Sequence, residues 1–456
     1  MENNETAAKR HKKRETYCFY APLPLGVVAV TAVYRMKLIL SSLPLIVGMS
    51  ALAQEVVVPS ETAARETLRL STDQSTLRFG GLDLFPHAAG GVQYDDNILI
   101  SHADQLTDVI WTISPGLTLA GGDVGAYLPG SVTVEQLRNL LYYSLVTDIR
   151  KPGRFFAVDY TPSFNFYTDH SNYDNTGQSV RLSGGYSFSR LALGLDFDYD
   201  RAQVKNTGAG TLTQNSTYNA SFRSRYDLSD RTSLEVNGRY YLLDYDNPIY
   251  QGYTEVKNEE WLNRQFADRL SLGVGLAFGF VFPNGSANQT YEQLLARAVY
   301  RLSGKLYFSS SLGVELREYD SGQANTINPV VSLSSIYQVR QGTTLNLEGH
   351  RADSPSFYAG QNNTLLGATI GASQLLFGRL STSASLGYNN YEYTTTVPGS
   401  STSRADNYFF GRLQFDYQFN RHVSGSISYT YYRDDSSSSA YSYDNSMIGM
   451  QVTWRL

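Results

Sequence analysis

The chain has 456 residues and a formal net charge of −5, and it contains 35 Tyr, 21 Phe and 38 Gly. Its mean hydropathy is −0.30. After residue 54 no apolar run reaches the roughly 20 residues that a membrane-spanning helix requires. The small charge argues against a nucleic-acid-binding protein, which would carry a basic patch or stripe. This composition therefore excludes membrane helices from the body of the chain and disfavours nucleic acid as a partner.

Residues 1–53 are expected to be a leader. From Met36 a lysine precedes the apolar residues 38–52, and the stretch closes with the A-x-A cleavage signal that ends at Ala53. A positive start, an apolar centre and such a cleavage signal are typical of a secretory signal peptide. We therefore expect export by the Sec pathway, with cleavage after Ala53.

The residues that precede Met36 fit no standard leader, so we expect translation to start at Met36. A membrane anchor at residues 21–34 is the alternative, but about 14 residues with a proline are too short to cross a bilayer. Cys18, the only cysteine, lies in the leader, so the exported chain has no thiol for a disulfide or a metal site. The polar residues 54–87 are predicted to be a periplasmic segment before the folded domain.

A repeated hairpin pattern dominates the remainder, residues 88–456. At each junction an apolar strand end is followed by two or three turn residues, usually a basic residue, and a new alternating strand, which is typical of tight hairpin turns. About 35 to 40 residues separate successive junctions, enough for two strands and one longer polar loop. Short turns on one side and long loops on the other are the asymmetry of an outer-membrane barrel. The junctions lie at residues 186–193, 226–234, 265–272, 300–306, 337–345, 376–380 and 417–423.

The strands alternate between apolar and polar residues, as a sheet between lipid and water would. In residues 191–200 leucine and aromatic residues share one face, while aspartate, alanine and glycine share the other. The pattern predicts an all-β fold, a transmembrane up-and-down antiparallel β-barrel of about 18 strands, with 16 possible. Two places fit less well: residues 253–266 alternate poorly, and residues 120–153 are predicted to be an irregular or helical insertion.

The last strand places Ile448, Met450, Val452, Trp454 and Leu456 on one face. Alternating apolar residues up to the chain end resemble the signal that the barrel-assembly machinery reads, although that signal commonly closes with an aromatic residue and this chain closes with leucine. The expected partners are therefore that machinery and outer-membrane lipid, and the expected location is the Gram-negative outer membrane. The oligomeric state does not follow from the sequence.

Two early strands carry a family resemblance. The segment Gly90-Gly-Val-Gln-Tyr-Asp-Asp-Asn-Ile98 is followed by Thr107-Asp-Val-Ile-Trp-Thr-Ile-Ser-Pro-Gly-Leu117. This pair resembles the β-barrel porin 2 family of Gram-negative bacteria, and the resemblance covers roughly residues 80–456. It implies an outer-membrane porin, with some members associated with exopolysaccharide systems, and it implies no catalytic residues. The insertion after Gly121 departs from the family's short connection.

Charged residues on the predicted lumen face are the candidate site. Opposed charges across a channel bias which ions or sugars pass; the alternative is that mixed charges in a wet lumen pair with one another. The predicted function is a porin-like channel for polar solutes, with a possible link to exopolysaccharide export. A surface adhesin or receptor that acts through its loops is the alternative. The predicted pore-lining residues are Asp196, Asp198, Asp200, Arg223, Arg225, Arg239, Arg297, Arg301, Glu315, Arg317 and Arg412.

Other candidate chemistry is weaker. Asp95, Asp96 and Asn97 offer oxygen ligands to a cation such as Ca²⁺, but a strand that ends at a polar loop explains them equally well. His350 beside Glu348 lacks a spaced serine or aspartate for acyl-transfer catalysis. We therefore predict no catalytic residues, no metal and no cofactor. Most tyrosines are expected in the girdles at the membrane interfaces, although Tyr241, Tyr307 and Tyr319 are predicted to point inward, where they would suit a sugar chain.

Overall fold

The computed structural model describes residues 57–58, 77–122, 153–303, 305–340, 342–399 and 403–456. The expected leader and nearly all of the insertion predicted at residues 120–153 lie outside the described residues. Within the described part, no helix is both long and apolar enough to cross a membrane. The two short 3-10 helices there are η2 (Ser171–Tyr173) and η3 (Ser439–Tyr441).

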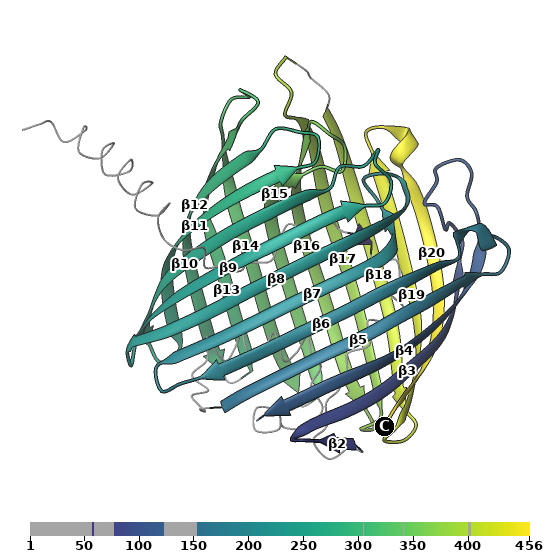
Figure 1. The fold of residues 1–456 in the computed structure, drawn as a ribbon, viewed down its shortest axis with the longest axis horizontal. Helices are drawn as coiled ribbons and strands as arrows, with labels where there is room; N and C mark the ends of the chain where they lie inside the picture. The colour runs from purple at the N-terminus through teal and green to yellow at the C-terminus, as the bar shows by residue number, and fades with distance from the viewer. Residues whose placement is uncertain (1–56, 59–76, 123–152, 304, 341, 400–402) are drawn as a thin grey trace, which may run out of the picture. The chain divides into compact units, whose positions relative to one another are not determined.

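Eighteen antiparallel strands, β3 to β20, form a closed barrel, which confirms the predicted fold class. Each strand pairs with the next along the chain, and β20 pairs with β3 to close the ring (Figure 1). The strands are β3 (Leu82–Asp95), β4 (Asp108–Gly122), β5 (Gly153–Tyr167), β6 (Asn175–Ser187), β7 (Leu191–Asn206), β8 (Thr211–Ser229), β9 (Thr232–Tyr245), β10 (Tyr253–Ala267), β11 (Leu270–Pro283), β12 (Gln289–Ser303), β13 (Leu306–Tyr319), β14 (Thr326–Arg340), β15 (Thr343–Pro355), β16 (Gln361–Leu376), β17 (Leu380–Thr395), β18 (Ser403–Gln418), β19 (Val423–Ser436) and β20 (Tyr443–Arg455).

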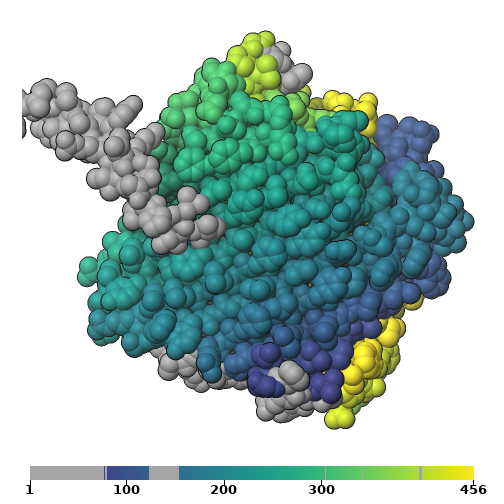
Figure 2. Space-filling view, in the orientation of Figure 1, coloured from purple at the N-terminus to yellow at the C-terminus, as the bar shows by residue number. Residues whose placement is uncertain are grey.

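The outer face of the barrel is apolar because alternate residues of each strand point outward. On β11, Val274 and Phe280 are 58% and 51% exposed, whereas Ala277 and Val281 point inward and are buried. Side chains of successive strands lie next to one another in oblique rows over this face (Figure 2). An apolar exterior on a closed ring leaves no free sheet edge, and the backbone amides pair between neighbouring strands, as a membrane requires.

The two ends of the barrel differ. Turns such as residues 230–231 and 268–269 join strands at one end, here called the turn end, and longer connections such as residues 96–107 join them at the other, here called the loop end. Both ends of the barrel chain meet at the turn end, where the amide of Leu456 donates a hydrogen bond to the carbonyl of Pro86 at 3.2 Å. The predicted asymmetry of short turns and longer loops is therefore present.

Three details depart from the simple pattern. The poorly alternating strand β10 is paired along its length with β9 and β11. The difference in polarity between its two faces is small because Asn258 and Glu260 lie on its outward face. The first barrel strand begins at Leu82, before the expected residue 88. Two short strands precede it: β2 (Leu77–Phe79) pairs with β3, and β1 (Val57–Val58) pairs with the loop end of β7.

Candidate functional site

A polar hollow of about 1790 Å³ lies along the inner face of β3 to β7 and β18 to β20. Its lining is dominated by hydroxyl and amide side chains because the inward positions of these strands carry serine, threonine, asparagine and glutamine. Such groups exchange hydrogen bonds with a neutral polar solute without fixing it by charge. The lining includes Thr112, Ser114, Thr161, Ser163, Asn165, Asn175, Ser179, Gln414, Ser426, Ser428, Thr430 and Gln451.

Ionisable side chains also line this hollow, and several of them are held by neighbours. Asp159 accepts hydrogen bonds from the hydroxyls of Thr118 and Thr161 at 2.7 and 2.9 Å. The imidazole of His87 lies 3.1 Å from the Thr161 hydroxyl and 3.7 Å from Asp159. Arg412 donates to the side-chain carbonyl of Gln414 at 2.8 Å. The acidic and basic residues of the lining are His87, Asp159, Arg181, Asp200, Arg201 and Arg412, so hydroxyl and amide groups outnumber the charged ones.

The opposite wall, β8 to β13, carries dense charge that is paired and buried. The guanidinium of Arg297 lies 2.6 Å from Glu235 and 2.7 Å from Asn263, and it stacks 4.1 Å from the centre of the Trp261 ring. These residues come from β9, β10 and β12, so the interactions reach across strands that are not neighbours. An ion pair with these additional partners is held within the wall, so its charges are not available to bind a solute.

A second buried network lies on the same wall. Arg317 is 1% exposed; it donates to Glu315 and Gln289, each at 2.8 Å, and to the backbone carbonyl of Asp353 at 3.0 Å. The hydroxyl of Tyr291 donates to Glu255 at 2.7 Å. Arg317 is therefore held within the wall by a carboxylate, an amide and a backbone carbonyl.

All eleven predicted pore-lining residues occupy inward positions of their strands. Asp200 and Arg412 line the polar hollow. Arg225, Arg297 and Arg301 line a second hollow, of about 680 Å³, at the turn end. The remaining six are Asp196, Asp198, Arg223, Arg239, Glu315 and Arg317.

Charges in this set pair within the wall instead of facing one another across the lumen. Arg223 pairs with Asp196 on the adjacent strand, and Arg239 lies 3.8 Å from Glu255 and 2.8 Å from Asn219. The alternative of mutually paired lumen charges therefore describes these residues better than a transverse field does. Their role in lining a solute pathway stays a prediction.

A buried aromatic cluster, here called the aromatic cap, occupies the lumen toward the loop end. From the sequence, most tyrosines were expected at the membrane interfaces and the cluster as a whole was missed, although the inward direction predicted for Tyr241 agrees with its burial there. The signal was present: tyrosines near the loop ends of these strands, such as Tyr391 and Tyr393, share the inward parity of polar lumen residues such as Asn389. The buried rings of the cap in the described residues are Tyr241, Tyr245, Tyr253, Tyr291, Phe357, Tyr391, Tyr393, Tyr408, Tyr432 and Tyr443.

Two loop tyrosines extend the aromatic cap. The ring of Tyr358 packs at a tilt against that of Phe357 with ring centres 4.3 Å apart, and its hydroxyl lies 3.4 Å from that of Tyr441. Burial, together with the hydrogen bond to Tyr441, raises the pKa of Tyr358 above its usual value. Tyr358 therefore stays uncharged at any pH that a cell surface meets.

The connection between β7 and β8 folds over the lumen and meets the aromatic cap. Residues 202–213, here called the crossing hairpin, continue past the last pairing of β7 with β6, which is at Arg201. A Cβ added to Gly208 would lie 2.2 Å from the Phe357 ring and 2.8 Å from the Tyr393 hydroxyl. The carbonyl of Gly208 accepts a hydrogen bond from Arg404 at 2.9 Å. Because these partners belong to β17, β18 and the β15–β16 loop, the hairpin reaches the far wall.

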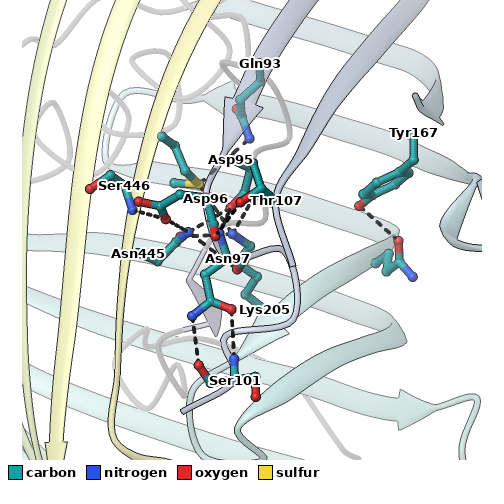
Figure 3. A network of polar contacts seen from close by, with 12 residues as sticks. Gln93, Asp95, Asp96, Asn97, Ser101, Thr107, Tyr167, Lys205, Asn445 and Ser446 are labelled. Carbon is teal, nitrogen blue, oxygen red and sulfur yellow. Dashed lines mark hydrogen bonds and ion pairs between the residues drawn. The ribbon is translucent and has the colours of Figure 1, made fainter. Parts of the chain in front are cut away.

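Lys205 anchors the crossing hairpin to the seam where the barrel closes (Figure 3). Its ammonium lies 2.5 Å from the Asp95 carboxylate on β3 and 2.9 Å from the side-chain oxygen of Asn445 on β20. The amide of Asn445 in turn donates to Asp95 and Asp96 at 2.7 and 3.0 Å. These four contacts join the first barrel strand, the last one and the hairpin.

The same network accounts for the cation ligands that the sequence suggested. Asp95 faces the ammonium of Lys205, Asp96 accepts from Asn445 and from the amide of Ser446, and Asn97 donates to the carbonyls of Ser101 and Asp444. A lysine thus supplies the positive charge there. In the part of the chain that the structure describes, no group of three His, Cys, Asp or Glu residues is placed to hold a metal ion.

The comparisons with known proteins found similarity only to solved structures. No protein-family model matches the chain, and no curated protein matches it. The outer membrane protein OpdK from Pseudomonas aeruginosa is 11% identical with a TM-score of 0.38, covering 82% of this chain and 98% of its own. OpdL from the same organism is 12% identical, with a TM-score of 0.41 and coverage of 83% and 99%. OccAB3 from Acinetobacter baumannii is 10% identical, with a TM-score of 0.39 and coverage of 82% and 100%. The resemblance to the β-barrel porin 2 family stays a prediction.

Proposed function

We propose that this barrel is a porin-like channel of the Gram-negative outer membrane that passes polar solutes. The observation that carries the proposal is the hollow on the inner face of the barrel, behind an apolar exterior and lined mainly by hydroxyl and amide groups. A lining of this kind replaces part of a solute's hydration shell at little electrostatic cost. Because these groups outnumber the charged ones in the lining, the hollow favours neutral, hydroxyl-rich solutes, such as saccharides, over ions.

A link to carbohydrate export is the finer part of the proposal. The inward tyrosines of the aromatic cap present ring faces beside the hydroxyl-lined hollow, and sugar rings pack on such faces through their apolar C–H surfaces. Tyr432 belongs to the aromatic cap and also lines the hollow. The family resemblance, with its association with exopolysaccharide systems, points in the same direction.

The crossing hairpin supplies a constriction in this proposal. It is anchored at Lys205 and packs on Phe357 and Tyr393, so a solute that enters from the loop end meets it before the hollow. We infer that its position sets the size of the open pathway. The crossing hairpin also covers the lumen at the loop end, and this covering favours the alternative function, an adhesin or receptor that acts through surface loops.

Reconstitution of the purified protein distinguishes the two functions. Planar-bilayer recordings are expected to show stable conductance steps, and liposomes that contain the protein are expected to swell faster in neutral sugars than protein-free liposomes. A variant in which residues 204–211 are replaced by a short Asn-Gly turn, which favours hairpins, is expected to conduct more. If both the wild type and this variant stay closed in bilayers and liposomes, the channel proposal is wrong and the surface-loop function gains support.

A further inference from the structure

The inner face of β18 to β20, near the loop end, holds a buried carboxylate with no hydrogen-bond partner. Asp434 is 1% exposed, and neither of its carboxylate oxygens has a partner. A buried negative charge without a partner is costly, because the group loses its hydration and gains nothing in exchange. The position therefore calls for a positive charge beside Asp434.

The only basic side chain placed close by in the described strands is already engaged. Arg404 forms an ion pair with Asp406 at 3.0 Å and donates to the carbonyl of Gly208 at 2.9 Å. Its guanidinium is also held between the rings of Tyr393 and Tyr441, 4.0 and 3.9 Å from their centres. Arg404 pairs with Asp406 and acts on Asp434 only from a distance, so two buried carboxylates share one positive charge.

Two tyrosines pair with Asp434 across the sheet, and their hydroxyls also lack partners. Tyr408 on β18 and Tyr443 on β20 are the residues directly opposite Asp434 in the two adjoining ladders. They are 0% and 4% exposed, and the hydroxyl of each has no hydrogen-bond partner. Residues that are directly opposite in a sheet have Cβ atoms about 5 Å apart. One rung of the inner wall thus carries a buried carboxylate and two buried phenol hydroxyls with unused lone pairs.

We propose that Asp434, Tyr408 and Tyr443 bind a hard cation on the inner wall of the barrel, near the loop end. Carboxylate and neutral oxygen atoms are the ligands that Ca²⁺, Mg²⁺ and Na⁺ take, and water completes the coordination shell of such ions. Asp406 on β18 adds to the negative potential at the site. Because Asp406 pairs with Arg404, it is not itself a ligand of the cation. The proposed site is independent of the channel function.

The cation would also support the anchor of the crossing hairpin. Arg404 lies between the acidic pair and the carbonyl of Gly208. When the ion neutralises the charge of Asp434, Arg404 keeps its ion pair with Asp406 and its hydrogen bond to the carbonyl of Gly208. Loss of the ion would draw the guanidinium toward Asp434 and away from the hairpin.

Terbium luminescence tests the proposal on the full exported chain in detergent. Tb³⁺ replaces Ca²⁺ at oxygen sites and emits when tyrosines within a few ångströms are excited, so Tyr408 and Tyr443 serve as built-in donors. We expect saturable emission that Ca²⁺ displaces, with Na⁺ and Mg²⁺ titrated in parallel to identify the preferred ion. Asp434→Asn is expected to weaken Tb³⁺ binding by about tenfold or more.

The matched control is Asp435→Asn, on the same strand but facing outward, where Asp435 pairs with Arg433 at 3.0 Å. This variant is expected to keep the wild-type affinity. Tyr408→Phe, which removes one ligand and leaves the ring, is expected to weaken binding less than Asp434→Asn and covers the case in which the aspartate variant fails to fold. Equal Tb³⁺ affinities in the wild type, Asp434→Asn and Tyr408→Phe would overturn the proposal. The absence of saturable emission would also overturn it, because it would mean that a proton, and not a cation, neutralises Asp434.

Discussion

Lys205 and Asp95 stand 110 residues apart in the chain, yet the ammonium of one lies 2.5 Å from the carboxylate of the other, and both side chains are almost fully buried. Asp95 belongs to the first strand of the barrel and Lys205 to the fifth, at the base of the crossing hairpin. The pair joins the hairpin to the seam of the barrel. We therefore expect this buried ion pair to be a main anchor of the hairpin, beside the contacts that Asn445 and Arg404 make with it.

Replacement of Lys205 by methionine is expected to release the crossing hairpin. The change leaves Asp95 buried without its counter-charge, which costs about 3–5 kcal/mol. Because about 1.4 kcal/mol is a tenfold change in an equilibrium, the hairpin should leave its docked position and the single-channel conductance should rise. Planar-bilayer recordings measure this directly.

The control for that substitution is Arg201→Gln. Arg201 and Asp246 form a half-exposed ion pair at 2.6 Å, and Arg201 also lines the polar hollow. Exposed pairs contribute little to stability, so Arg201→Gln is expected to leave the hairpin docked and to change conductance less than Lys205→Met. The double variant Lys205→Met with Asp95→Asn should fold more stably than Lys205→Met alone, because no unpaired charge remains. An unchanged conductance in Lys205→Met would show that the ion pair does not hold the hairpin.

Gly208 tests the packing of the same hairpin without a change of charge. A methyl group there meets Phe357 at 2.2 Å and the Tyr393 hydroxyl at 2.8 Å, and overpacking of this kind costs about 1–3 kcal/mol. Gly208→Ala is therefore expected to displace the tip and raise conductance. Gly90→Ala is the matched control, since nothing lies within 4 Å of its added carbon. Equal conductance in the two variants would contradict the docked position of the tip.

Arg297 is expected to matter for stability rather than for selectivity. Arg297→Met leaves Glu235 buried without its partner and should lower the free energy of unfolding by about 3–5 kcal/mol. Arg433→Gln breaks an exposed pair with Asp435 and should leave the unfolding midpoint unchanged. Denaturant unfolding in detergent, followed by tryptophan fluorescence, compares them, and the Trp261 ring against Arg297 reports on the site. Similar midpoints for the two variants would contradict the buried network.

The strand alternation in the sequence was enough to predict the closed barrel, its strand number and the inner or outer face of residues such as Asp196 and Ile448. The alternation works because each residue of a membrane barrel meets either lipid or lumen. It could not predict where the chain leaves the wall. The crossing hairpin continues the pattern of β7, and its contact between Gly208 and Phe357 joins loops far apart in sequence. No local pattern records that contact, so the aromatic cap and the Lys205 anchor were missed.

Ion selectivity should depend on Arg412, because it lines the polar hollow and is partly open to it, with Gln414 as its hydrogen-bond partner. Arg412→Glu replaces one positive charge by a negative one on the wall of the hollow, so the local potential becomes more favourable to cations. The reversal potential in a salt gradient is expected to shift toward the cation value. Arg317→Gln removes a charge that is buried and paired with Glu315, and its expected effect is on stability. If Arg412→Glu leaves the reversal potential unchanged, ions do not pass through the hollow, and the route of solutes must be sought on another part of the inner wall.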